Sequence, residues 1–136
     1  MKIAPLIKLR ENRRDQQLHN LLDAEHNENA LRDRIRELER LLEQNLHEWR
    51  RTESCQPVPL EELKQLEAQR RELHRLQKEA LAQLAEATEA TEEERARLSA
   101  AVREVRVLEN LRDRKEQEAA VTAKKMEQRD LDRNGF

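Results

Sequence analysis

The sequence has almost no aromatic residues and almost no glycine. Of its 136 residues only Trp49 and Phe136 are aromatic, tyrosine is absent, and there is one glycine. Globular cores draw much of their buried area from aromatic side chains, and β-rich folds need β-branched and aromatic residues separated by glycine-containing turns. The composition therefore excludes an ordinary globular core and a β-sheet fold. A single glycine also excludes glycine-rich phosphate-binding loops.

Cysteine and long apolar runs are also scarce. Cys55 is the one cysteine and cannot form an internal disulfide, so we expect an exposed loop thiol in a reducing, cytoplasmic setting. No stretch resembles the apolar core of a signal peptide, and the apolar start at residues 3–7 is too short to cross a bilayer. We therefore expect no direct membrane insertion.

Charged residues, by contrast, make up 41% of the chain. The 27 basic and 29 acidic side chains give a net charge of −2, and the two signs are interspersed. Leu, Ala, Glu, Arg and Gln dominate, and all are good helix formers. This pattern is typical of a coiled coil whose surface carries many ion pairs. It does not favour nucleic acid as a partner, because the basic cluster at residues 10–14 is short and has acidic neighbours.

Two prolines divide the chain. Pro57 and Pro59 forbid a continuous helix through this segment, whereas Pro5 is tolerated in a first helical turn. We predict one all-α domain spanning residues 1–136, with a helix over 6–52, a turn at 53–58 and a longer helix over 59–133. The Asn134-Gly135 pair is typical of a helix end.

Both predicted helices carry a heptad pattern. In the first helix Leu21, Leu31, Ile35, Leu38 and Leu42 share one face, which Ile7, Ala24 and Trp49 extend, while Arg10, Arg14, Gln17 and Glu28 interrupt it. Twelve of twenty positions on the matching face of the second helix are apolar. The twenty are Leu63, Leu66, Arg70, Leu73, Gln77, Ala80, Leu84, Ala87, Thr91, Glu94, Leu98, Ala101, Val105, Leu108, Arg112, Lys115, Ala119, Thr122, Met126 and Arg129. A seam this long predicts a left-handed coiled coil.

A short linker between two such seams favours an antiparallel hairpin. Folding at the prolines would place Leu38 near Leu73 and Ile7 near Val105. The first helix then ends opposite residue 111 or so, and the second helix overhangs it by about 25 residues. We expect this overhang either to fray or to be held by another protein.

No constellation of residues supports catalysis or a cofactor. His19, Asp23 and His26 share a helix face and could form a surface zinc site only with a further ligand; ordinary exposed polar residues are the simpler interpretation. A two-helix fold has no enclosed pocket in which a pKa could be tuned or water excluded. We therefore predict no enzyme activity, no cofactor and no metal.

Two features have alternative interpretations. Trp49, with Leu46, Val58 and Leu60, either caps the open end of the hairpin or forms a binding hot spot, in which tryptophan is enriched. The small or polar seam residues between Ala80 and Ala101 either set the pairing register or form a flexible segment.

The organisation of the whole chain resembles the FliJ/YscO family of stalk proteins in type III secretion. The resemblance rests on an arginine-rich opening at 6–15 (LIKLRENRRD), the proline turn, and mixed-charge stretches at 112–119 (RDRKEQEA) and 124–132 (KKMEQRDLD). It implies an antiparallel coiled coil that is similar to the terminal helices of the rotary ATP synthase gamma subunit. It also implies a cytoplasmic protein, held at the inner membrane through the secretion apparatus.

The resemblance further implies two contact regions. The end that carries both termini would enter the pore of a hexameric secretion ATPase, and the opposite end would face the export gate protein; secretion chaperones are a further partner class. Carried onto this chain, the ring contact comprises Lys8, Arg10, Arg13, Arg14, Lys124, Lys125 and Arg129. The gate-facing tip comprises Trp49, Val58, Leu60 and Leu63.

A second hypothesis is a homo-oligomeric coiled-coil scaffold or adaptor. In that case the overhang would pair with a second copy of the chain. A monomer in solution favours the stalk, and an obligate dimer favours the scaffold.

Overall fold

A computed structural model describes residues 2–134 and contains two helices. Helix α1 spans Ile3–Glu53 and helix α2 spans Leu60–Arg133, and no strand occurs among the described residues. The all-α hairpin predicted from the sequence is confirmed. Contacts divide the chain into a turn unit, Leu21–Glu94, and a terminal unit, made of residues 2–20 and 95–134 of the described range. Both helices contribute to each unit.

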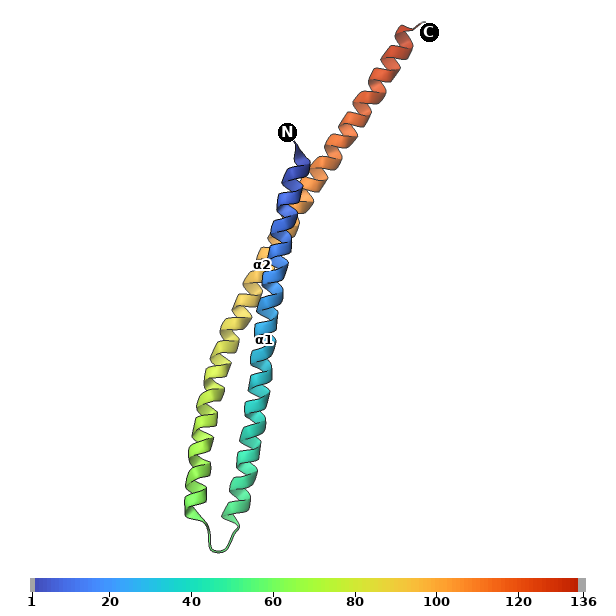
Figure 1. Cartoon of the computed structure of the whole chain (residues 1–136). Coiled ribbons are helices and arrows are strands. Elements are labelled where there is room, and N and C mark those ends of the chain that lie inside the picture. Colours follow the sequence, from blue (N-terminus) through green and yellow to red (C-terminus); the bar gives the residue numbers. More distant parts are fainter. Residues whose placement is uncertain (1, 135–136) are drawn as a thin grey trace. The chain divides into compact units, whose positions relative to one another are not determined.

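The turn unit is a pair of helices joined by the proline loop (Figure 1). Its apolar cluster consists of Ile35, Leu38, Leu73 and Ala80, with partly buried leucines packed around it. The predicted neighbours Leu38 and Leu73 therefore lie in one cluster. Along α1 every predicted seam residue from Ile7 to Trp49 is buried or half-buried, so the burial pattern confirms the heptad register.

Asn45 is a buried polar residue that the apolar pattern did not reveal. Its side chain is 3% exposed and lies on the seam between Leu42 and Trp49. The Nδ2 group donates to the Leu66 carbonyl oxygen at 3.0 Å and to Gln69 Oε1 at 2.9 Å. A buried polar side chain of this kind costs stability unless it is hydrogen-bonded, and it favours the one register that satisfies it. Asn45 therefore fixes the alignment of the two helices near the turn.

The terminal unit contains its own buried residues. Ile3, Ile7 and Val105 are 8%, 4% and 2% exposed, and Ala101 is also buried. Arg10 on α1 reaches across to α2, where its Nη1 lies 3.3 Å from Glu104 Oε2. These observations agree with the predicted pairing of Ile7 and Val105.

Beyond Arg112, helix α2 has no covered face. Arg112 is half-buried, and all of residues 113–134 are exposed. Figure 1 shows this part of α2, in orange and red, continuing past the start of α1 within the terminal unit. We call residues 113–134 the overhang. The predicted overhang is thus confirmed in place and approximate length.

The helix ends follow local chemistry. Helix α1 begins three residues earlier than the predicted residue 6, because Pro5 fits in its first turn. Arg50 and Arg51 lie in the last turn of α1, and Glu61 and Glu62 lie in the first turn of α2. Basic side chains at the C-terminal end of a helix and acidic side chains at the N-terminal end interact favourably with the helix dipole. Between them Ser54 Oγ donates to the Arg51 carbonyl oxygen at 2.8 Å. The predicted stop at Gly135 lies outside the described residues.

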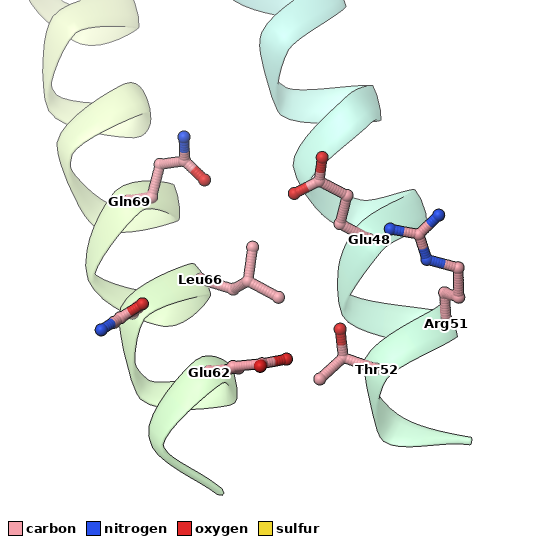
Figure 2. A pocket seen from close by; sticks show the side chains of 7 residues that line it. Glu48, Arg51, Thr52, Glu62, Leu66 and Gln69 are labelled. Atoms are coloured by element: carbon pink, nitrogen blue, oxygen red, sulfur yellow. The ribbon is translucent and has the colours of Figure 1, made fainter. Parts of the chain in front are cut away.

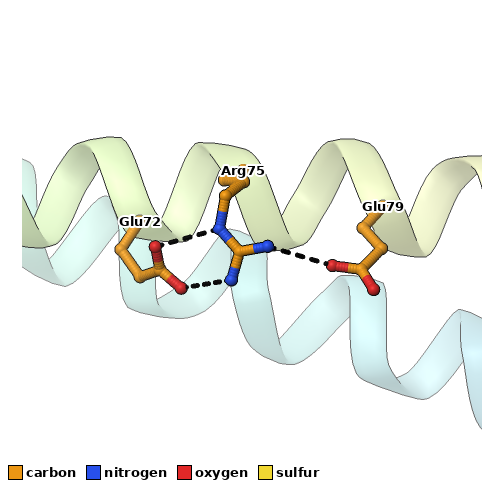
Figure 3. A network of polar contacts seen from close by, with 3 residues as sticks. All are labelled: Glu72, Arg75 and Glu79. Atoms are coloured by element: carbon orange, nitrogen blue, oxygen red, sulfur yellow. Dashed lines mark hydrogen bonds and ion pairs between the residues drawn. The ribbon is translucent and has the colours of Figure 1, made fainter.

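Ion pairs cover the outer faces of the helices. Figure 3 shows Arg75 between Glu72 and Glu79, with its Nε 3.0 Å from Glu72 Oε2 and its Nη1 3.3 Å from Glu79 Oε2. The hydrogen bond from Arg75 lowers the pKa of Glu72, and the one from Arg40 lowers the pKa of Glu37. All these groups are exposed, so each pair contributes little on its own.

Candidate interaction surfaces

Four basic residues near the start of α1 form what we call the terminal cluster: Lys8, Arg10, Arg13 and Arg14. Arg10 pairs with Glu104, and Arg14 Nη2 lies 3.4 Å from Asp15 Oδ1. Both arginines are half-buried at seam positions, whereas Lys8 and Arg13 are exposed. Within the described residues, neither Lys8 nor Arg13 has an ion pair. The charge available to a partner therefore comes mainly from Lys8 and Arg13.

A shallow groove adjoins the terminal cluster. It runs between the two helices of the terminal unit and is lined by Arg13, Gln17, Arg97, Ala100, Ala101 and Glu104. The two alanines leave room at its floor, while Arg13 and Arg97 place positive charge along its edge.

The other predicted ring-contact residues lie farther along α2. Lys124, Lys125 and Arg129 belong to the overhang and are exposed. Arg10 of the terminal cluster pairs with Glu104 on α2, and twenty residues separate Glu104 from Lys124, which is roughly 30 Å of helix. The structure thus brings Arg10 to α2 but does not gather the seven predicted residues into one patch.

The gate-facing tip contains both exposed and packed residues. Val58 and Leu60 are 39% and 66% exposed, and Leu63 is half-buried. Trp49 is half-buried, with the guanidinium carbon of Arg70 5.2 Å from the centre of its ring. Arg70 Nε also points at Asn45 Oδ1, at 3.4 Å. Trp49 is therefore engaged within the chain, and Val58 and Leu60 are the apolar side chains that a partner can reach.

Sequence reasoning missed the polar groove beside the turn. Figure 2 shows Glu62 and Thr52 facing each other between the ends of the helices, with Leu66 one helical turn farther along α2. Glu48, Arg51, Gln65 and Gln69 complete the lining. Thr52, at 9% exposed, follows the heptad spacing that leads from Asn45 through Trp49, and that spacing was the signal that could have placed it on the seam.

The helix face with His19, Asp23 and His26, and the thiol of Cys55, were the other candidate chemical sites. Among residues 2–134 no group of three or more His, Cys, Asp or Glu side chains is arranged to hold a metal ion. Cys55 is exposed in the turn, where its Sγ lies 3.4 Å from the Arg51 carbonyl oxygen. Over the same described range, neither helix has a segment apolar enough over a sufficient length for a membrane span.

The chain matches a known protein family. Residues 1–133 match the family model described as flagellar FliJ protein. No curated protein and no solved structure matches the chain significantly. The match covers both helices and the turn, so it concerns the whole hairpin and its overhang.

Proposed function

The chain belongs to the FliJ family of flagellar and type III export components, and from this premise we propose that it couples a hexameric secretion ATPase to the export gate. It contributes no catalytic group. The family match over residues 1–133 carries the proposal. In this proposal the chain acts as one domain, in the cytoplasm, held at the inner membrane by the export apparatus.

The terminal cluster is the proposed contact with the ATPase ring. Lys8 and Arg13 are exposed and have no ion pair within the described residues, so no internal ion pair has to break when they bind an acidic surface. Lys124, Lys125 and Arg129 extend this contact along the overhang. Such charges speed the encounter between two proteins and make its rate sensitive to salt. The ring would cover a helix surface that this chain leaves open.

The first experiment reverses the charge of Lys8 and Arg13. We expect the Lys8→Glu/Arg13→Glu variant to keep the helicity of the parent protein and to lose most of its stimulation of the partner ATPase. The matched control is Arg34→Glu/Lys78→Glu, which makes the same charge change at two exposed positions of the turn unit that have no ion pair within the described residues. Equal stimulation by the two variants would contradict a ring contact at the terminal cluster.

The exposed apolar side chains at the turn are the proposed contact with the gate. Val58 and Leu60 present apolar surface beside the turn groove, and apolar contact of this kind supplies binding energy when it is buried. Trp49 and Leu63, both half-buried, complete the proposed tip. We expect Val58→Ser/Leu60→Ser to weaken binding to the isolated gate protein without changing ATPase stimulation.

The control for the gate contact is Leu22→Ser/Leu81→Ser. Leu22 and Leu81 are 53% and 49% exposed, and both lie in the turn unit away from the proline loop. The control variant should bind the gate as the parent does. If it loses gate binding to the same degree, the apolar residues at the turn have no special role.

A further inference from the structure

The heptad seam of α2 continues into the overhang, where its character changes. From Leu63 to Arg112 every seam position of α2 is buried or half-buried. Beyond that point Lys115, Ala119, Thr122, Met126 and Arg129 follow the same spacing and are all exposed. The overhang thus carries the last five of the twenty seam positions, which α1 does not cover.

Positive charge occupies both ends of this open seam. Lys115 lies at one end, Arg129 and Arg133 at the other, and small or apolar residues lie between them. None of these three cations forms an ion pair within the described residues. The acidic residues of the overhang lie to either side of the seam: Asp113, Glu116, Glu118, Glu127, Asp130 and Asp132. The seam itself has no acidic residue.

This charge pattern disfavours a second copy of the chain as the occupant. In a parallel pair each seam cation would face the same residue of the other copy. In the antiparallel pair centred on Ala119 and Thr122, Arg112 of one copy would face Arg129 of the other. Like charges at facing positions destabilise a coiled coil and select against the pairing.

We propose that the overhang binds a helix of another protein that carries carboxylates at its own seam positions. These carboxylates face Lys115, Arg129 and Arg133, and apolar side chains of the partner pack on Ala119, Thr122 and Met126 between them. The partner helix continues the coiled coil that α1 begins. The inference goes beyond the ring contact, because it concerns the seam face of the overhang and shares only Arg129 with that set.

The test uses the full chain and two designed 21-residue helical peptides. The two peptides have identical apolar seam residues and differ only in carrying Glu or Lys at the positions that face the three cations. Three exposed charge pairs change binding by about tenfold. We therefore expect the Glu peptide to bind about tenfold more tightly than the Lys peptide at low salt, with the difference shrinking as salt screens the charges. Fluorescence anisotropy of labelled peptide measures both affinities.

Two triple variants locate the effect. Lys115→Glu/Arg129→Glu/Arg133→Glu should invert the peptide preference, whereas Arg114→Glu/Lys124→Glu/Lys125→Glu makes the same charge change off the seam and should preserve it. The proposal is overturned if the two variants shift the preference equally, or if neither peptide binds the parent chain. Light scattering adds a separate outcome, since a dimer that requires residues 113–133 would make a second copy the occupant. None of these measurements involves the ATPase, so they stand apart from the ring-contact experiment.

Discussion

Leu38 offers the sharpest test of the packing between the helices. It is 1% exposed and belongs to the cluster with Ile35, Leu73 and Ala80. Replacing it by alanine removes buried methyl groups and leaves a cavity, which costs about 2–5 kcal/mol in well-packed cores. Only two helices line this site and they can move together, so we expect Leu38→Ala to lower the free energy of unfolding by about 2–3 kcal/mol.

The matched control is Leu81→Ala. Leu81 is 49% exposed on α2, so the same change of side chain removes little buried surface and should cost less than about 0.5 kcal/mol. Urea unfolding followed by circular dichroism at 222 nm measures both values. Equal costs at the two positions would refute the reasoning, because they would mean that α2 does not cover Leu38.

Further predictions concern the polar residues and the overhang. Asn45→Ala should lower the free energy of unfolding by about 1–3 kcal/mol, because it removes the hydrogen bonds to the Leu66 carbonyl and to Gln69. Asn45→Leu should instead keep or raise the melting temperature, because an apolar side chain replaces a buried polar one. It should also cause self-association in light scattering, because Asn45 no longer specifies the register of the two helices. A lower melting temperature without self-association would contradict the role of Asn45 in fixing their alignment. The lowered pKa values of Glu37 and Glu72 mean that their ion pairs stabilise the fold above the ordinary glutamate value of 4.5, and that this contribution disappears as pH falls below it toward the lowered pKa values. Because both pairs are exposed, replacing both glutamates by glutamine should make the loss of stability on acidification only slightly smaller, and a larger loss would refute the assignment. Hydrogen exchange should be fast for the amides of residues 113–133 in the isolated chain and slow for those of residues 95–108, and equal protection would mean that the overhang is covered.

Much of the fold could be predicted from the sequence because its information is local and periodic. The prolines locate the turn, and the spacing of Leu31, Ile35 and Leu38 indicates which face is buried. The overhang follows from the different number of residues on the two sides of the turn. Asn45 could not be found in this way, because a polar residue on the seam carries no apolar signal and its partners lie on the other helix.

The interaction surfaces were harder to predict. The sequence suggested a basic cluster, but only the structure separates Arg10, which pairs with Glu104, from Arg13, which has no ion pair within the described residues. Similarly, Trp49 is conspicuous in the sequence, yet its stacking with Arg70 depends on the pairing of the helices. Binding surfaces on a coiled coil need no special residue types, so composition and spacing give little warning of them.

Site-specific photocrosslinking tests the coupling role most directly. A photoreactive residue at position 13 should crosslink to the secretion ATPase, and one at position 60 should crosslink to the export gate protein, when both partners are present with the full chain. The account would be contradicted if position 13 crosslinked to the export gate protein and position 60 to the ATPase. It would also be contradicted if both positions crosslinked to the same partner.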